Sequence, residues 1–161
     1  MLPDGDYLYA CDNRWWRYHK DAVQAQFSGK KYYPVDADRQ NLIDPHIVAD
    51  LDMFGVAASF GGGFDPTQIK YGPRDGSANS TYQALTLAFL LGAEYVVLLG
   101  LDLSAGHFFG DHPPEIRGPN EHSRQKNAFK TFPKDKQVFN ASPTSKLDVF
   151  PKYTLSEIFD D

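Results

Sequence analysis

Two consecutive apolar segments in the middle of the chain constrain the fold most. Residues 80–91 are apolar on nearly every side of a helix, and a continuous apolar stretch follows over residues 95–103. A helix that is apolar all round is a buried helix. A strand without polar alternation is typical of a parallel sheet that is covered on both faces. The pair therefore predicts a three-layer α/β domain with a mainly parallel sheet.

Local signals define the ends of these two segments. The sequence Ser80-Thr-Tyr-Gln83 has the form of a capping box, and Gly92 is the residue type at which helices end. We expect Ser80 to cap a helix that ends near Leu91, with Gln83 completing the box. We also expect Tyr95–Leu101 to form a central strand that is paired on both sides.

Shorter elements surround this centre and alternate in type, as the layered architecture requires. Pro34 predicts that its strand lies at an edge of the sheet or ends there. Glycine, proline and polar residues over 61–78 predict a long loop. The remaining predicted strands are 6–12, 30–34, 54–60 and 138–140, and the predicted helices are 15–26, 120–131 and 154–159.

Composition limits the classes of function. A chain of 161 residues corresponds to one domain, which we place at residues 1–161. The 16 basic against 21 acidic residues give a net charge of −5, which argues against a broad nucleic-acid-binding face. The single cysteine, Cys11, excludes a disulfide-stapled scaffold. Without an apolar run of ~20 residues or a signal peptide, we expect a soluble cytoplasmic protein with no membrane partner. The oligomeric state stays open.

A ligand site is expected where the parallel strands end. Ligands of open α/β sheets bind outside the carboxyl ends of the strands, beside helix N-termini whose amides favour phosphate. Asp102 would accept hydrogen bonds from a ribose hydroxyl or an amino group. Taken singly, Asn79 and Ser80 have a simpler interpretation as helix caps, and Asp102 as a loop cap. Four segments should converge at this edge: Cys11–Asp12, Asn79–Ser80, Gly100–Asp102 and Asn140–Ser142.

Histidines supply the remaining candidates for chemistry. His107, Asp111 and His112 lie within six residues, and such side chains bind zinc and other divalent ions. Loop spacing of this kind is not a metal signature, so we interpret them as a structural Asp–His pair and assign no metal site. His122 stands near the start of a predicted helix. Its imidazole is the natural general base near neutral pH, oriented by Glu121 or Ser123.

The central segment also resembles a known superfamily. Residues 79–103, with Asn-Ser-Thr-Tyr-Gln-Ala at the start and Gly-Leu-Asp near the end, resemble the core motif of the bacterial sialyltransferases of glycosyltransferase family 42. The same pattern occurs in DUF115, or 6-hydroxymethylpterin pyrophosphokinase-like, proteins. The likeness is greatest to a set from tailed bacteriophages that shares Phe-Phe-Gly-Asp-His-Pro, here residues 108–113. It extends from Asp6 to about Pro151.

The resemblance implies a Rossmann-like fold and a set of roles. His122, in Glu-His-Ser, corresponds to the general base of those transferases, which take sugar from a cytidine-type nucleotide and need no metal for chemistry. The nucleotide contacts are implied for Asn79, Ser80 and Thr81 through backbone amides, for Gly100 and Asp102 at the ribose or base, and for Asn140 and Ser142 where the site closes.

Two departures separate this chain from those relatives. Thr81 stands where they have glycine, which hinders a close backbone approach. Relatives also begin with a strand and a Gly-x-Gly-Pro-Ser turn that contacts phosphate, and no such segment precedes Asp6. We therefore expect an N-terminally truncated version of the fold.

Three functions follow from the resemblance. The first is a transferase that binds a nucleotide or nucleotide sugar, in which His122 removes a proton from an acceptor hydroxyl. The second is a non-catalytic phage protein that binds or sequesters a nucleotide-like small molecule, or that serves in virion assembly, in the host cytoplasm. The third is a pterin-type pyrophosphokinase, whose Mg²⁺ would take Asp12, Asp102 and Asp111 as ligands.

Overall fold

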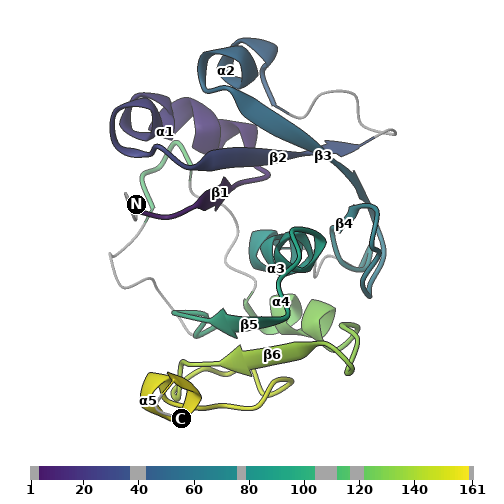
Figure 1. Ribbon diagram of the computed structural model, residues 1–161. Coiled ribbons are helices and arrows are strands. Elements are labelled where there is room, and N and C mark those ends of the chain that lie inside the picture. The colour runs from purple at the N-terminus through teal and green to yellow at the C-terminus, as the bar shows by residue number, and fades with distance from the viewer. Residues whose placement is uncertain (1–3, 37–42, 76–78, 104–111, 117–121, 160–161) are drawn as a thin grey trace.

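The chain folds into a Rossmann-like α/β structure in which strands and helices alternate, as predicted (Figure 1). The computed structural model describes residues 4–36, 43–75, 79–103, 112–116 and 122–159. In chain order its elements are β1 (Tyr7–Tyr9), α1 (Asn13–Gln26), β2 (Lys30–Asp36), α2 (Pro45–Asp50), β3 (Met53–Ser59), β4 (Ile69–Lys70), α3 (Ser80–Leu90), β5 (Tyr95–Leu98), α4 (His122–Phe129), β6 (Gln137–Asn140) and α5 (Leu155–Phe159).

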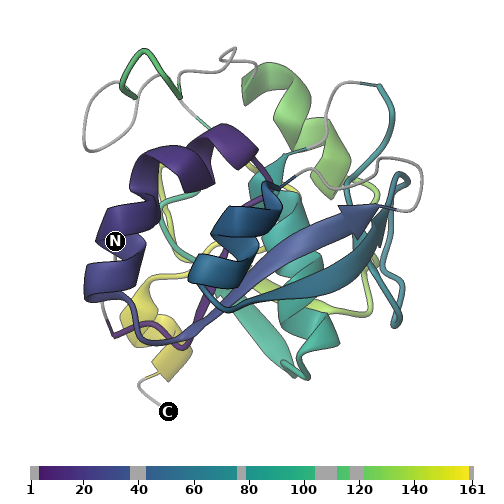
Figure 2. The same ribbon diagram turned by 90° about the horizontal axis from the view of Figure 1, so that it is seen from above.

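The larger sheet has four parallel strands in the order β1-β2-β3-β4. Helices α1 and α2 cover one face, where Trp16, Val23 and Ile47 belong to one buried apolar cluster. Helix α3 covers the other face (Figures 1 and 2), where Leu87 packs with Tyr32 and other sheet residues. The three-layer arrangement predicted from the apolar patterns is confirmed in this part of the molecule.

Pro34 lies in an inner strand, so the prediction of an edge strand was wrong. Strand β2 pairs with both β1 and β3, and Pro34 itself is opposite Val56. The physical reason is the shortness of β1, which pairs only with residues 30–32. Beyond Tyr32 one side of β2 has no neighbouring strand among the described residues, so a residue without an N–H group is tolerated there.

The predicted loop of residues 61–78 contains the two-residue strand β4, which pairs with the end of β3. An antiparallel bridge between Gly61 and Gly72 closes the connection. The described part of this loop therefore extends the sheet.

Within the described residues the second sheet consists of β5 and β6, which run parallel. The prediction of a central strand over residues 95–101, paired on both sides, was therefore wrong. Strand β5 ends at Leu98 because the backbone then leaves the extended conformation, with φ of +67° at Gly100 and +47° at Leu103. Such left-handed values are incompatible with a continuing strand. The strand's sole pairing partner within the described residues is β6.

Helix α3 holds the two sheets together. Tyr82, Leu85 and Phe89 pack with β5, β6 and the surroundings of α4, whereas Leu87 packs with the larger sheet. Its burial on two sides confirms the prediction made from its all-round apolar sequence. Among the described helices, none is long and apolar enough to cross a membrane.

The cap of α3 is Asn79, so the predicted Ser80 cap was wrong. Asn79 has an extended backbone, and its side-chain oxygen accepts a hydrogen bond from the Tyr82 N–H at 2.8 Å. Ser80 is already the first helical residue. Gln83 accepts a hydrogen bond from the Tyr9 hydroxyl at 2.6 Å instead of completing a capping box. The helix ends with Leu91 as cap and Gly92 at φ +96°, as the glycine predicted.

We expect Asn79→Ala to lower the free energy of unfolding by about 1 kcal/mol, because the Tyr82 N–H loses its acceptor. Ser80→Ala is the matched control and should change it by less than about 0.5 kcal/mol. Urea denaturation of both variants measures this. A larger loss in Ser80→Ala than in Asn79→Ala would contradict the assignment of the cap.

Candidate functional site

The start of α3 lies beside the carboxyl end of β1. The Tyr9 hydroxyl donates to Gln83 in the first turn of the helix. Cys11 follows β1 and is half-buried. Burial raises the pKa of the Cys11 thiol to about 11, and the neighbouring Asp12 carboxylate adds to the shift. Cys11 is therefore a neutral thiol near pH 7, with little thiolate available as a nucleophile.

The backbone N–H groups of Ser80 and Thr81 stand at the start of α3. Asn79 satisfies two first-turn donors, since its side chain accepts from the Tyr82 N–H and its carbonyl from the Gln83 N–H. The N–H groups of Ser80 and Thr81 have no acceptor among the described residues. Ser80 is exposed and Thr81 half-buried. This helix start therefore offers two donors and the positive end of the helix dipole to an anion.

Helix α4 approaches the same place. The Asn79 side-chain amide donates to the Gln125 carbonyl over 3.4 Å, a distance near the limit for a hydrogen bond. His122 is the first residue of α4, one turn before Gln125. The side chain of His122 lies outside what the structure describes. The backbone thus places α4 next to the start of α3, as the predicted site requires.

Another group of predicted site residues forms where β5 and β6 end. The Gly100 N–H donates to the Ser142 hydroxyl at 2.9 Å, and the Lys146 N–H donates to the Asp102 carbonyl at 2.8 Å. The carboxylate of Asp102 is half-buried and makes no hydrogen bond to a described residue. The structure therefore brings Gly100 and Asp102 next to Ser142, as predicted.

Asn140 and Ser142 are committed to this group. Asn140 is fully buried, its side-chain oxygen accepts from the Ser142 N–H, and its amide donates to the Leu147 carbonyl. Ser142 is buried as well and holds the loop after β5. In this arrangement Asn140 has no exposed atom to offer a ligand. Both side chains fix the two loops that follow the strands.

Asp12 is likewise engaged. Its carboxylate caps α1 through the Arg14 N–H at 2.8 Å and pairs with the Arg14 guanidinium at 2.8 Å. The Arg14 hydrogen bond lowers the pKa of Asp12. A magnesium ion at Asp12 would have to displace both contacts.

The predicted site residues thus form two groups that no hydrogen bond between described side chains connects. One contains Asn79, Ser80 and Thr81 with the first turns of α4. The other contains Gly100, Asp102, Asn140 and Ser142. Of the His107, Asp111 and His112 cluster, the first two lie outside the described residues. Among the residues that the structure covers, no three His, Cys, Asp or Glu side chains are placed to hold a metal.

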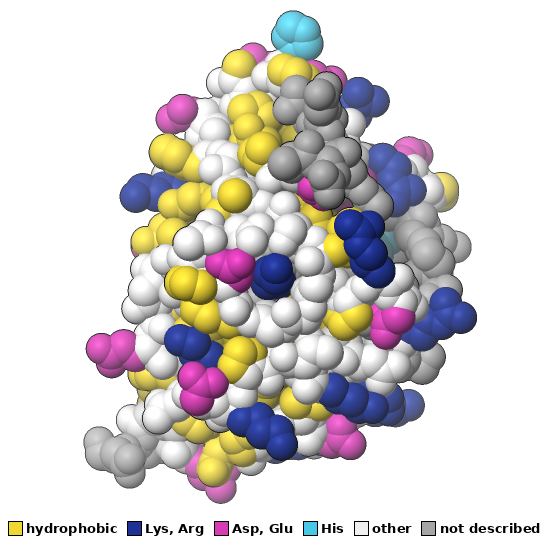
Figure 3. Space-filling model, turned by 90° about the vertical axis from the view of Figure 1, so that its right-hand side faces the viewer, with side chains coloured by type: hydrophobic (Ala, Val, Ile, Leu, Met, Phe, Trp, Pro, Cys, Tyr) yellow, Lys and Arg dark blue, Asp and Glu magenta, His cyan; other side chains and the backbone are white. Residues whose placement is uncertain are grey.

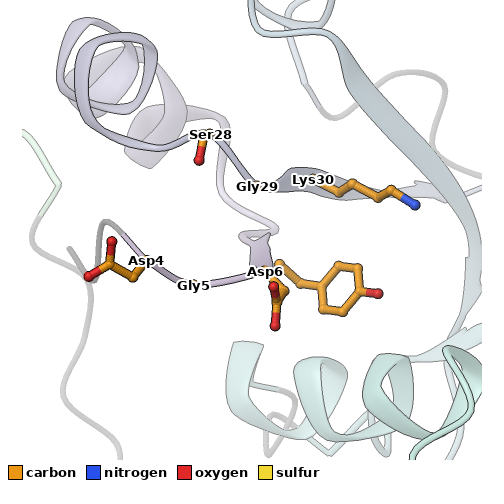
Figure 4. A pocket seen from close by; sticks show the side chains of 7 residues that line it. Asp4, Gly5, Asp6, Ser28, Gly29 and Lys30 are labelled. Atoms are coloured by element: carbon orange, nitrogen blue, oxygen red, sulfur yellow. The ribbon is translucent and has the colours of Figure 1, made fainter.

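A shallow pocket of about 290 Å³ lies at the opposite edge, where β1 and β2 begin. It is lined by Asp4, Gly5, Asp6, Tyr7, Ser28, Gly29 and Lys30. Lys30 extends away from Asp4 and Asp6 (Figure 4), so these charged groups do not converge on one ligand position. Gly29 is required there, because an added Cβ would lie 2.5 Å from the Asp6 carbonyl oxygen. We interpret this pocket as the close packing of two strand starts.

Charges are mixed on the face shown in Figure 3. Lys and Arg side chains are scattered over it, with Asp and Glu side chains and small hydrophobic areas between them. Anion binding at this surface would therefore depend on local donors rather than on a broad positive field.

Comparison with protein-family models, with curated proteins and with solved structures finds no match to this chain. The likeness to sialyltransferases and phage proteins therefore stays a prediction from the sequence.

The sequence interpretation missed Gln83 as a link between β1 and α3. It is buried in a mainly apolar helix and contacts Tyr9, whose hydroxyl donates to it. A glutamine within an apolar run is a signal of such a buried partner, since buried polar groups are normally hydrogen-bonded.

We expect native Cys11 to react with iodoacetamide about 100-fold more slowly at pH 8 than the unfolded chain does. The pKa is raised from 9.0 to about 11, and each unit lowers the thiolate fraction tenfold. Since the folded-state pKa is the higher one, the rate should rise as the pH approaches 11. Mass spectrometry of the labelled protein follows the reaction. Asp12→Asn keeps the α1 cap, removes the charge and should speed labelling, whereas equal rates in folded and unfolded protein would contradict the burial of the thiol.

Proposed function

We propose that this protein binds a nucleotide or nucleotide sugar and transfers a group from it. The observation that carries the proposal is the pair of backbone N–H groups of Ser80 and Thr81, which have no acceptor among the described residues. They lie at a helix start between the end of β1 and α4. A phosphate at this position would accept both N–H groups and meet the positive end of a buried helix. With a net charge of −5, the chain needs such a local device to hold an anion.

The other roles follow from the resemblance to the sialyltransferase-like proteins. Asp102, whose carboxylate has no described partner, would accept hydrogen bonds from the ribose or base. His122 would take the proton from an acceptor hydroxyl, whose oxygen attacks the sugar while the nucleotide leaves. Asn79 would position these parts, since it caps α3 and contacts α4. We also propose a cytoplasmic location and a phage origin. An unpaired thiol such as Cys11 stays reduced in the cytoplasm.

Binding without turnover is the second candidate. Thr81 stands in place of glycine, and Asn140 and Ser142 are buried in internal hydrogen bonds. Both observations favour a protein that holds a nucleotide-like molecule but does not close over it. The pyrophosphokinase alternative has no such support, because Asp12 is already paired with Arg14.

We expect Ser80→Pro to weaken nucleotide binding about tenfold, because proline removes one amide donor. Ser80 is the first helical residue, a position that favours proline, and the preceding Asn79 has ψ 157°, which suits a residue before proline. The helix should therefore stay intact. Calorimetric titration with cytidine, uridine, adenosine and guanosine nucleotides measures the affinity.

Ser80→Ala is the matched control, since it removes the hydroxyl and keeps the amide. It should bind with nearly unchanged affinity. If no nucleotide binds the natural chain, or if Ser80→Pro binds as tightly as Ser80→Ala, the proposed phosphate position is wrong.

For the transfer itself, we expect His122→Ala to lower kcat by roughly 10²–10⁴-fold with little change in nucleotide affinity, because a general base acts in the transition state. Single-turnover transfer from a cytidine nucleotide sugar tests this. Unchanged turnover in His122→Ala would rule out the general base. Tight binding with no turnover by the natural chain would favour the binding protein.

A further inference from the structure

The two faces of the smaller sheet differ in their surroundings. Val96 and Leu98 of β5 belong to the apolar cluster that contains residues of α3 and α4. Successive side chains alternate between the two faces of a strand, so Tyr95 and Val97 point the other way, together with Phe139, which is opposite Val97 in β6. Parallel sheets are normally covered on both faces. The side chains on the outward face of this pair therefore show whether it is covered.

Three aromatic rings form a row across this outward face. The ring centroid of Phe139 lies 6.1 Å from that of Tyr95 and 5.7 Å from that of Tyr153. Tyr153 joins the row because the chain near it runs beside β6. There the Asn140 N–H donates to the Pro151 carbonyl, and the Tyr153 N–H donates to the Asn140 carbonyl. Both tyrosines at the ends of the row are exposed, so the outward face is an aromatic surface in contact with solvent.

Helix α5 follows Tyr153 closely and adds further apolar side chains. In Figure 1 it lies on the side of the β5–β6 pair away from α3, and none of its residues is buried. Local hydrogen bonds define its start, since the Thr154 N–H donates to the Glu157 carboxylate at 2.7 Å and the Glu157 N–H donates to the Thr154 hydroxyl at 3.3 Å. Leu155 and Phe159 are four residues apart and share one side of the helix. A helix of five residues gains little stability from its own hydrogen bonds, so we expect this apolar side to pack against another surface.

The apolar area of this surface is large for a chain of this size. We define the C-terminal face as the aromatic row, the residue that follows β5 and the apolar side of α5, namely Tyr95, Leu99, Phe139, Tyr153, Leu155 and Phe159. All of these side chains except Phe139 are between 41% and 65% exposed. Side chains of this size have roughly 150–250 Å² of surface, so each exposes roughly 100 Å² and the face roughly 500 Å². Apolar patches of that extent are among the largest on monomers and are often functional.

Area and charge favour a second copy of this chain as the partner. A two-fold symmetric contact uses the same patch on both copies, which doubles the apolar area to roughly 1,000 Å² before backbone and flanking side chains are counted. That value is near the lower limit for a specific protein–protein interface, roughly 1,000–1,200 Å². The side chains of the face are uncharged, so they offer no complementary group to a charged partner. Two copies with a net charge of −5 each can meet there without bringing like charges of the face together.

We propose that the protein forms a two-fold symmetric dimer in which the C-terminal faces of two copies pack together. The contact buries the aromatic row and the apolar side of α5 of each copy. It gives the smaller sheet an apolar cover on its outward face, as is usual for parallel strands. The face contains none of the residues proposed to bind a nucleotide, so dimer formation is independent of the proposed function.

Sedimentation velocity of the full chain over a range of concentrations tests the dimer. We expect the mass to rise from that of one chain to that of two, with a dissociation constant on the order of micromolar, because the interface is at the small end of the range for specific complexes. A chain that stays monomeric up to about 1 mM has no such contact, and the proposal is then wrong. In that case the C-terminal face would have to be covered by a different protein.

Charged substitutions test which surface forms the dimer. Phe159→Glu and Tyr95→Glu each place a carboxylate in the face and should raise the dissociation constant more than about tenfold, because an unpaired charge is costly to bury. Tyr18→Glu is the matched control, since Tyr18 is 49% exposed on α1, outside the face, and should change the constant by less than about twofold. Circular dichroism verifies folding, and Phe159→Glu suffices if Tyr95→Glu does not fold, because α5 has no buried residue. An unchanged dimer in Phe159→Glu, or equal weakening in Tyr18→Glu, would overturn the proposal.

Discussion

The burial of α3 on two sides is the constraint on which the rest of the structure depends. Tyr82, Leu85 and Phe89 pack into one apolar cluster, and Leu87 packs into another. Because one helix belongs to both clusters, the larger sheet and the β5–β6 pair are fixed relative to each other through it. A substitution that shortened this helix would therefore disturb both sheets together.

The same helix brings the candidate site together. Its first turn receives Tyr9 from the end of β1 and contacts α4 through Asn79. Its cap uses two of the first-turn amides, and those of Ser80 and Thr81 have no acceptor in the part of the chain that the structure describes. The stability of α3 and the proposed phosphate position are thus linked, since both depend on which acceptors the first-turn N–H groups of this helix find.

Polar side chains at the ends of β5 and β6 hold the loops that follow these strands. Asn140, Ser142 and Ser145 are buried and hold the loops after the two strands by hydrogen bonds to backbone groups. Residue types that suit ligand binding also suit the satisfaction of buried backbone groups. The sequence offers no means of distinguishing the two uses, because the distinction depends on which backbone groups are left without partners after folding.

Local patterns in the chain were sufficient to predict the α/β class, the buried α3, its end at Gly92 and the location of most strands, because hydrophobic periodicity and glycine conformation are local properties. The folded chain was needed to show that Asn79 rather than Ser80 caps α3, that Pro34 lies in an inner strand and that β5 has one pairing partner among the described residues. A strand's neighbours depend on segments far away in the chain, here the short β1 and the left-handed turn at Gly100. An apolar sequence therefore predicts that a strand is buried. It does not predict how many strands pair with it, because that number depends on the assembled sheet.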